Sequence, residues 1–117
     1  MDLQEIGSYA FILGVIIAVL AGIGGYFFPF GADIGYWIVI VLVILGIIVG
    51  LLNITEKETV TFLVATIALM ATSAIGWQYI PKIGIIIAQI LSYIGVFVAP
   101  AAVIVSLLAI KKIASVK

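Results

Sequence analysis

The sequence predicts an all-α integral membrane protein, a four-helix bundle built from two tandem transmembrane hairpins with both termini on the same side. Of its 117 residues 67% are hydrophobic and only 9% are charged, too few to give a water-soluble domain of this size a polar surface. The apolar residues form four long runs, and the polar ones gather between the runs or at the chain ends. We therefore expect one domain, residues 1–117, with spans at about 6–28, 34–52, 58–80 and 84–110.

The first run, residues 6–28, is long enough to cross the roughly 30 Å hydrocarbon core of a bilayer. It stops at Pro29, in an aromatic-rich turn typical of the membrane boundary. Small residues share one of its helical faces, and such faces let helices approach closely in lipid. We expect helix packing at Gly14, Ala18 and Gly22.

The second run, residues 34–52, is nearly all Ile, Val and Leu, which predicts the most lipid-exposed helix of the four. Its second half is interrupted by two glycines four residues apart, Gly46 and Gly50. This GxxxG spacing is a candidate helix-packing or dimer face, although it also arises by chance in Gly-rich membrane chains.

The third run, residues 58–80, follows the central polar stretch 53–58. Thr55 and Glu58 have the spacing of a capping box, which would start the helix. Small residues lie on two of its faces, so we expect this helix between neighbours, or lining a narrow pore if several copies assemble around it. One of these faces contains Ala65, Ala68, Thr72 and Gly76.

The fourth run, residues 84–110, is longer than the hydrocarbon is thick, and Pro100 provides a bend. Gln89 and Tyr93 lie one turn apart within it. A buried amide in lipid needs a partner, so we expect a polar contact between helices at these two residues in preference to substrate recognition. The small residues of this run form the most complete packing face of the chain, which includes Ala88, Ser92, Gly95 and Ala99.

The lysines predict the orientation. With four spans, Lys57, Lys111, Lys112 and Lys117 share one side, whereas Lys82 stands alone on the other. The positive-inside rule then places both termini in the cytoplasm, with the chain a multi-pass protein of the cell membrane.

The composition excludes several classes of chemistry. The chain has no Cys, no His and zero net charge, so we expect no metal site, no cofactor, no nucleic-acid binding and no enzymatic activity. Its length is similar to that of the small multidrug-resistance transporters, and rotor proteolipids are also small hairpin proteins. Both families depend on a carboxylate inside the membrane, which none of these runs offers, and this argues against an ion-coupled pump.

Two functions remain open. The first is a structural protein that self-assembles in the lipid bilayer, or an accessory subunit packed against other membrane proteins. The alternative is a passive pore, a homo-oligomer of the holin or channel type, with the third helix, and Gln89 as a further candidate, at its lining.

Overall fold

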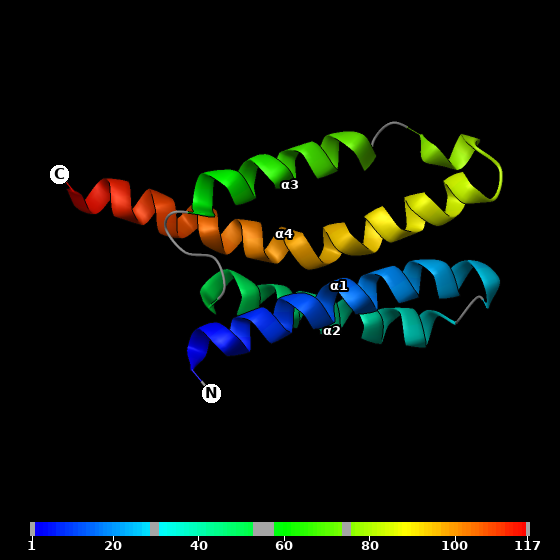
Figure 1. Ribbon diagram of the computed structural model, residues 1–117, viewed down its shortest axis with the longest axis horizontal. Helices are drawn as coiled ribbons and strands as arrows, with labels where there is room; N and C mark the ends of the chain where they lie inside the picture. Colours follow the sequence, from blue (N-terminus) through cyan, green and yellow to red (C-terminus); the bar gives the residue numbers. More distant parts are fainter. Residues whose placement is uncertain (1, 29–30, 53–57, 74–75, 117) are drawn as a thin grey trace.

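A computed structural model describes residues 2–28, 31–52, 58–73 and 76–116 of the chain, and these residues form helices and short turns with no strand among them (Figure 1). The prediction of an all-α protein is confirmed. Three helices, α1, α2 and α4, are long and apolar enough to cross a membrane, and α3 is a shorter apolar helix. In chain order the elements are α1 (Leu3–Phe27), α2 (Ala32–Leu52), α3 (Thr59–Ser73), the 3-10 helix η2 (Trp77–Tyr79) and α4 (Ile83–Val116).

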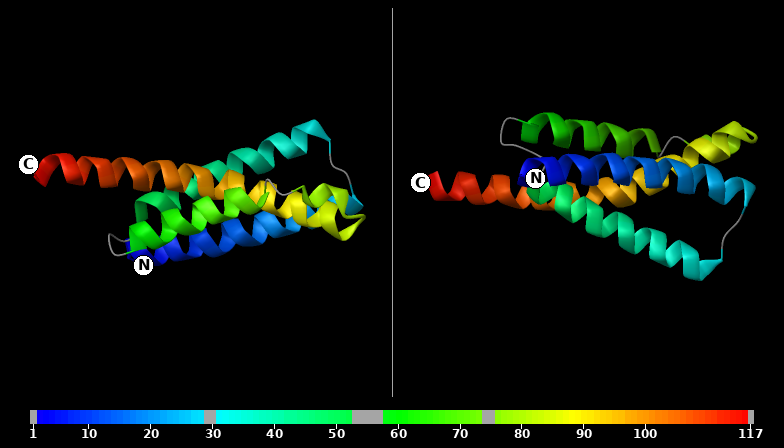
Figure 2. Two further views of the ribbon diagram at one scale, coloured as in Figure 1. Left: turned by 90° about the horizontal axis from the view of Figure 1, so that it is seen from above. Right: turned by 60° about the horizontal axis from the view of Figure 1, so that its bottom comes forward.

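Helix α4 lies at the centre of the molecule. It packs against α1 and α2, which also pack against each other, and α3 covers another side of it. Figure 1 shows α4 between α3 and the α1–α2 pair, and Figures 1 and 2 show the N- and C-termini at the same end of the bundle. Every other helix is therefore held in place by the residues along α4.

The N-terminus of α1 is capped by a side chain. The backbone N–H of Glu5 donates a hydrogen bond to Oδ1 of Asp2, 2.8 Å away. The bond satisfies one of the amide groups that the first turn of a helix leaves without a partner. The capping box expected for α3 rests on Thr55, which lies outside the described residues.

The third helix differs from its expected range because α3 ends at Ser73 and does not continue to Ile80. Gly76 has a φ of 88°, a left-handed conformation that stops a helix and that glycine adopts without strain. The indole Nε1 of Trp77 then donates a hydrogen bond to the carbonyl oxygen of Thr72, at 2.8 Å. The aromatic residues beyond this point thus form a separate turn that folds back over the helix end.

The start of α4 is packed closely under that turn. A side chain on Gly84 would overlap the carbonyl oxygen of Trp77 and the side chain of Ile80. Lys82, just before α4, has a φ of 61°, in the left-handed region that few non-glycine residues adopt. The reversal between η2 and α4 therefore depends on a small residue at position 84.

Helix α4 is longer than the run 84–110, since it covers 34 residues, Ile83–Val116. At 1.5 Å per residue it measures roughly 50 Å, well over the thickness of the hydrocarbon core. Pro100 lies inside it, where the missing N–H leaves the carbonyl of Val96 without its usual helical donor. Figure 1 shows α4 bending near its middle and its C-terminal end extending beyond the other helices.

The core is formed where α1, α2 and α4 meet. Phe97, Leu42 and Val49 are its largest fully buried side chains. Helix α2 was expected to be the most lipid-exposed, yet it buries four residues, whereas Thr66 is the only buried residue among those whose burial is described in α3. The reason is position: α2 contacts two helices, and α3 packs extensively only against α4.

Candidate functional site

The glycines of α1 and α2 form close contacts with the middle of α4. A Cβ on Gly14 would overlap the ring of Phe97, and a Cβ on Gly46 would overlap the carbonyl oxygen of the same residue. The Phe97 ring also stacks edge to face on Phe11, with a centroid separation of 5.9 Å. Phe97 thus fits a space that exists because two facing helices lack side chains there.

Two further small-residue contacts lie on either side of Phe97. A Cβ on Gly22 would lie 2.7 Å from the Cα of Ile90, and one on Gly50 would lie 3.0 Å from the Cα of Ala101. Ala18, between Gly14 and Gly22, is fully buried. The structure therefore brings the expected packing residues of α1 and α2 together around α4, and the GxxxG pair lies against α4 of the same chain.

The expected packing residues of α3 and α4 lie elsewhere. Ala65, Ala68 and Thr72 are exposed on the side of α3 that faces away from α4, and Gly76 lies beyond the end of this helix. On α4, Ser92 is exposed, and a Cβ on Gly95 would meet no atom within 4 Å. The remaining two, which are half-buried, are Ala88 and Ala99.

Two hydroxyl groups of α3 are engaged within the helix itself. Thr66 donates its hydrogen bond to the carbonyl oxygen of Phe62 and Thr72 to that of Leu69, both at 2.9 Å. Each hydroxyl hydrogen is thereby used, as is common for Thr in membrane helices. These two groups can accept a hydrogen bond from a permeating solute but have no second hydrogen to donate.

Gln89 and Tyr93 lie one turn apart on α4, both half-buried. Tyr93 packs against the core. The side-chain oxygen of Gln89 is buried and has no hydrogen-bond partner among the described residues. Hence the polar contact between helices that was expected here is not made by this oxygen, and a buried acceptor remains unsatisfied.

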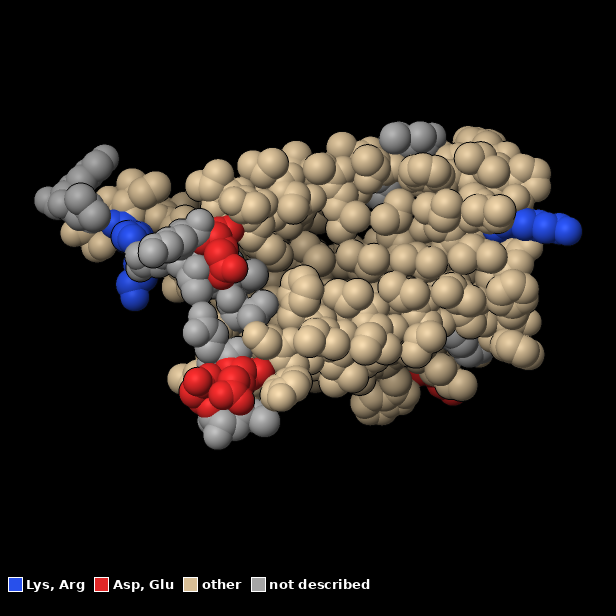
Figure 3. Space-filling view, in the orientation of Figure 1, with Lys and Arg blue, Asp and Glu red and all other residues tan. Residues whose placement is uncertain are grey.

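Charged residues in the described part of the chain lie near helix ends. Asp2 and Glu5 begin α1, Asp33 begins α2, Glu58 precedes α3, and Lys82 precedes α4; the last turns of α4 hold Lys111 and Lys112. Figure 3 shows these charges toward the two ends of the molecule, with an uncharged surface between. In the same part of the chain, no three Asp or Glu side chains lie close enough together to hold a metal ion.

Two residues that matter in this arrangement were not singled out from the sequence. Phe97 is an ordinary apolar residue in an apolar run, and only its two glycine partners on other helices make it central. Trp77 falls within the predicted third span, and its residue type gave no indication of its bond to Thr72. A search for large side chains facing glycines on separate helices would have needed the tertiary structure.

Comparison with known proteins identifies no relative: no protein-family model, curated protein sequence or solved structure matches the chain. The function has to be argued from the chain's own residues.

Proposed function

We propose that the chain is a four-span, non-enzymatic protein of the cell membrane that acts by packing against other transmembrane helices, either as a homo-oligomer or as an accessory subunit. The observation that carries the proposal is the distribution of polar groups. Large apolar side chains are exposed along all four helices, among them Leu13, Ile44, Ile67 and Leu107, and the described charges stay near the ends. Such a surface is stable in lipid and not in water.

Helix α3 supports the association part of the proposal. It packs extensively only against α4, and it leaves Ala65, Ala68 and Thr72 exposed. In lipid, small side chains at a surface allow the backbone of another helix to come close, which bulky side chains prevent. A helix from another chain would gain van der Waals contact at this face and at Gly95 of α4.

The pore alternative has less support. Its lining was expected on α3, where the hydroxyls of Thr66 and Thr72 are bonded to backbone carbonyls of their own helix. Liposomes containing the pure protein should therefore remain tight to small ions. Rapid leakage proportional to the protein content would favour the pore instead.

The test of the proposal is native mass spectrometry of the protein extracted gently from its own membrane. We expect either a discrete homo-oligomer or one copy accompanied by other polypeptides. Ala68→Leu and Gly95→Leu should reduce that assembly several-fold, because Ala68 is exposed, a side chain on Gly95 would meet no atom of the chain within 4 Å, and leucine adds bulk at both. Gly24→Leu is the matched control, since Gly24 also has open space around it but lies on α1. A wild-type chain that is always monomeric and unaccompanied would contradict the proposal.

A further inference from the structure

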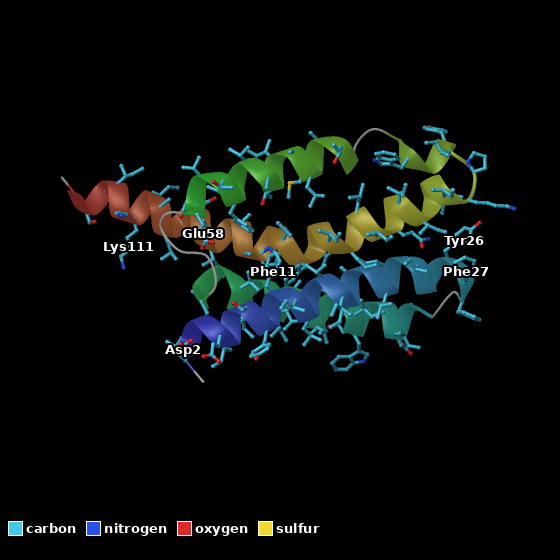
Figure 4. The ribbon with its side chains drawn as sticks, viewed as in Figure 1. Asp2, Phe11, Tyr26, Phe27, Glu58 and Lys111 are labelled. Atoms are coloured by element: carbon cyan, nitrogen blue, oxygen red, sulfur yellow. The ribbon has the colours of Figure 1, made fainter. Side chains whose placement is uncertain are left out.

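A groove of about 510 Å³ lies between the first residue of α3 and the last turns of α4. It is at the end of the bundle where both termini lie, and Figure 4 shows Lys111 and Glu58 there. The uncharged surface of the molecule begins on one side of this region and the charged end lies on the other (Figure 3). A ligand in the groove would therefore lie between the uncharged surface of the molecule and its charged end.

The floor of the groove is apolar. Val105 is almost completely buried, and Leu108 and Ile113 are 50% and 63% exposed. Together with Ala109 they come from successive turns of α4 and form a strip along the helix axis. An extended hydrocarbon chain lying along this strip would cover apolar surface that the protein itself leaves open.

The rim of the groove is basic. Lys111 and Lys112 line it from α4, and Thr59 lines it from the start of α3. Ser115 is also at the rim, but its hydroxyl donates to the carbonyl of Lys112 at 3.0 Å, so it can only accept a further hydrogen bond. An anion bound here would take its donors from the ammonium groups and would lie at the positive N-terminal end of α3.

We propose that this groove binds one anionic phospholipid, with the phosphate at Lys111 and Lys112 and an acyl chain on the strip of Val105, Leu108, Ala109 and Ile113. The proposal rests on the membrane location given under the proposed function. Both parts of the ligand are needed: the ammonium groups select a negative headgroup, and the strip selects a chain attached to it. The carboxylate of Glu58, just before α3, offsets part of the positive charge, so the expected preference is moderate.

The experiment is a lipid titration of the full-length protein in mild detergent, read by native mass spectrometry. Phosphatidylglycerol and phosphatidylcholine with identical acyl chains are the two probes. We expect about tenfold tighter binding of phosphatidylglycerol, in line with the attraction of two lysines near a headgroup. In Lys111→Gln/Lys112→Gln the two lipids should bind equally. Lys82→Gln, which removes a positive charge at the opposite end of the bundle, should keep the preference.

Three results would overturn the proposal: equal binding of the two lipids to the wild type, a preference that survives the double substitution, or a preference that Lys82→Gln abolishes to the same degree. Inorganic phosphate at millimolar concentration should not displace phosphatidylglycerol, and displacement would assign the groove to a free anion. Bound lipid and copy number are read as separate mass differences, so the lipid preference is scored for each assembly state on its own. A protein that fails to assemble can therefore still show the preference, and one that assembles can lack it.

Discussion

Gly46 and Phe97 show how much depends on single residues in this chain. A Cβ on Gly46 would overlap the carbonyl oxygen of Phe97, a backbone atom that cannot move aside without shifting α4. By contrast, Gly35 on the same helix has no atom within 4 Å of the position that a Cβ would take. The packing of α2 against α4 thus requires a residue without a side chain at position 46 and places no such requirement on position 35.

We expect Gly46→Ala to destabilise the bundle by about 1 to 3 kcal/mol, the usual cost of overpacking a core. Gly35→Ala should be neutral or slightly stabilising, because alanine restricts the unfolded chain and meets nothing in the folded one. The measurement is unfolding of both variants in mixed micelles of rising denaturing-detergent content. Equal midpoints for the two variants would show that α2 does not approach α4 at Gly46.

At the scale of the element, α3 is where the helix predicted from the sequence and the observed helix differ most. The apolar run continues to Ile80, but the α-helix covers 15 residues and stops at Ser73. The left-handed conformation of Gly76 and the indole of Trp77 end it. A helix of 15 residues is shorter than the roughly 20 that a membrane span needs, so the proposed fourth crossing would also require η2 and the turn before α4.

Trp77→Phe should weaken the end of α3 by about 1 kcal/mol, since it removes the hydrogen bond to Thr72 and retains an aromatic ring. Hydrogen exchange of the peptide that ends at Ser73 should become several times faster. The control is Trp37→Phe, because Trp37 is 63% exposed and contacts the ring of Tyr36. If both variants leave the exchange of this peptide unchanged, the indole bond does not hold the helix end.

At the scale of the whole molecule, the polar and aromatic residues divide the bundle into two ends and an apolar middle. The ring pairs Tyr26–Phe27 and Tyr36–Trp37 lie at the end of α1 and the start of α2, and Figure 4 shows Tyr26 and Phe27 at the end of the bundle away from the termini. Lys111 and Lys112 lie at the opposite end, near the C-terminus (Figure 1). Aromatic residues at one boundary, where Lys82 is the one described lysine, and Lys111 and Lys112 at the other agree with a bilayer between them.

The proposed four crossings, with the cytoplasmic termini that the lysines predict, can be tested by cysteine labelling, because the chain has no native cysteine. In sealed right-side-out vesicles, a membrane-impermeant maleimide should label Asp33→Cys and Ile80→Cys and should not label Glu58→Cys or Ser115→Cys. Permeabilising the vesicles should expose the latter two. Labelling of Glu58→Cys and Ile80→Cys from the same side would mean that α3 does not cross the membrane.

The sequence by itself determined that the chain is all-helical and where its apolar segments lie, because composition and run length depend only on local residues. It also marked small residues as packing positions, and Gly14, Ala18, Gly22, Gly46 and Gly50 do meet a neighbour within the chain.

Only the tertiary structure decided which helix is central, because a row of small residues along one helix does not indicate which other helix packs against it. It placed α4 between α3 and the α1–α2 pair, turned Ala65 and Ala68 outward, and made Phe97 the centre of the core. In the structure α3 is also shorter than the helix predicted from the sequence. The lysines of α4 lie near the first residue of α3, and the groove forms there. These features arise from contacts between residues far apart in sequence, and no local pattern contains them.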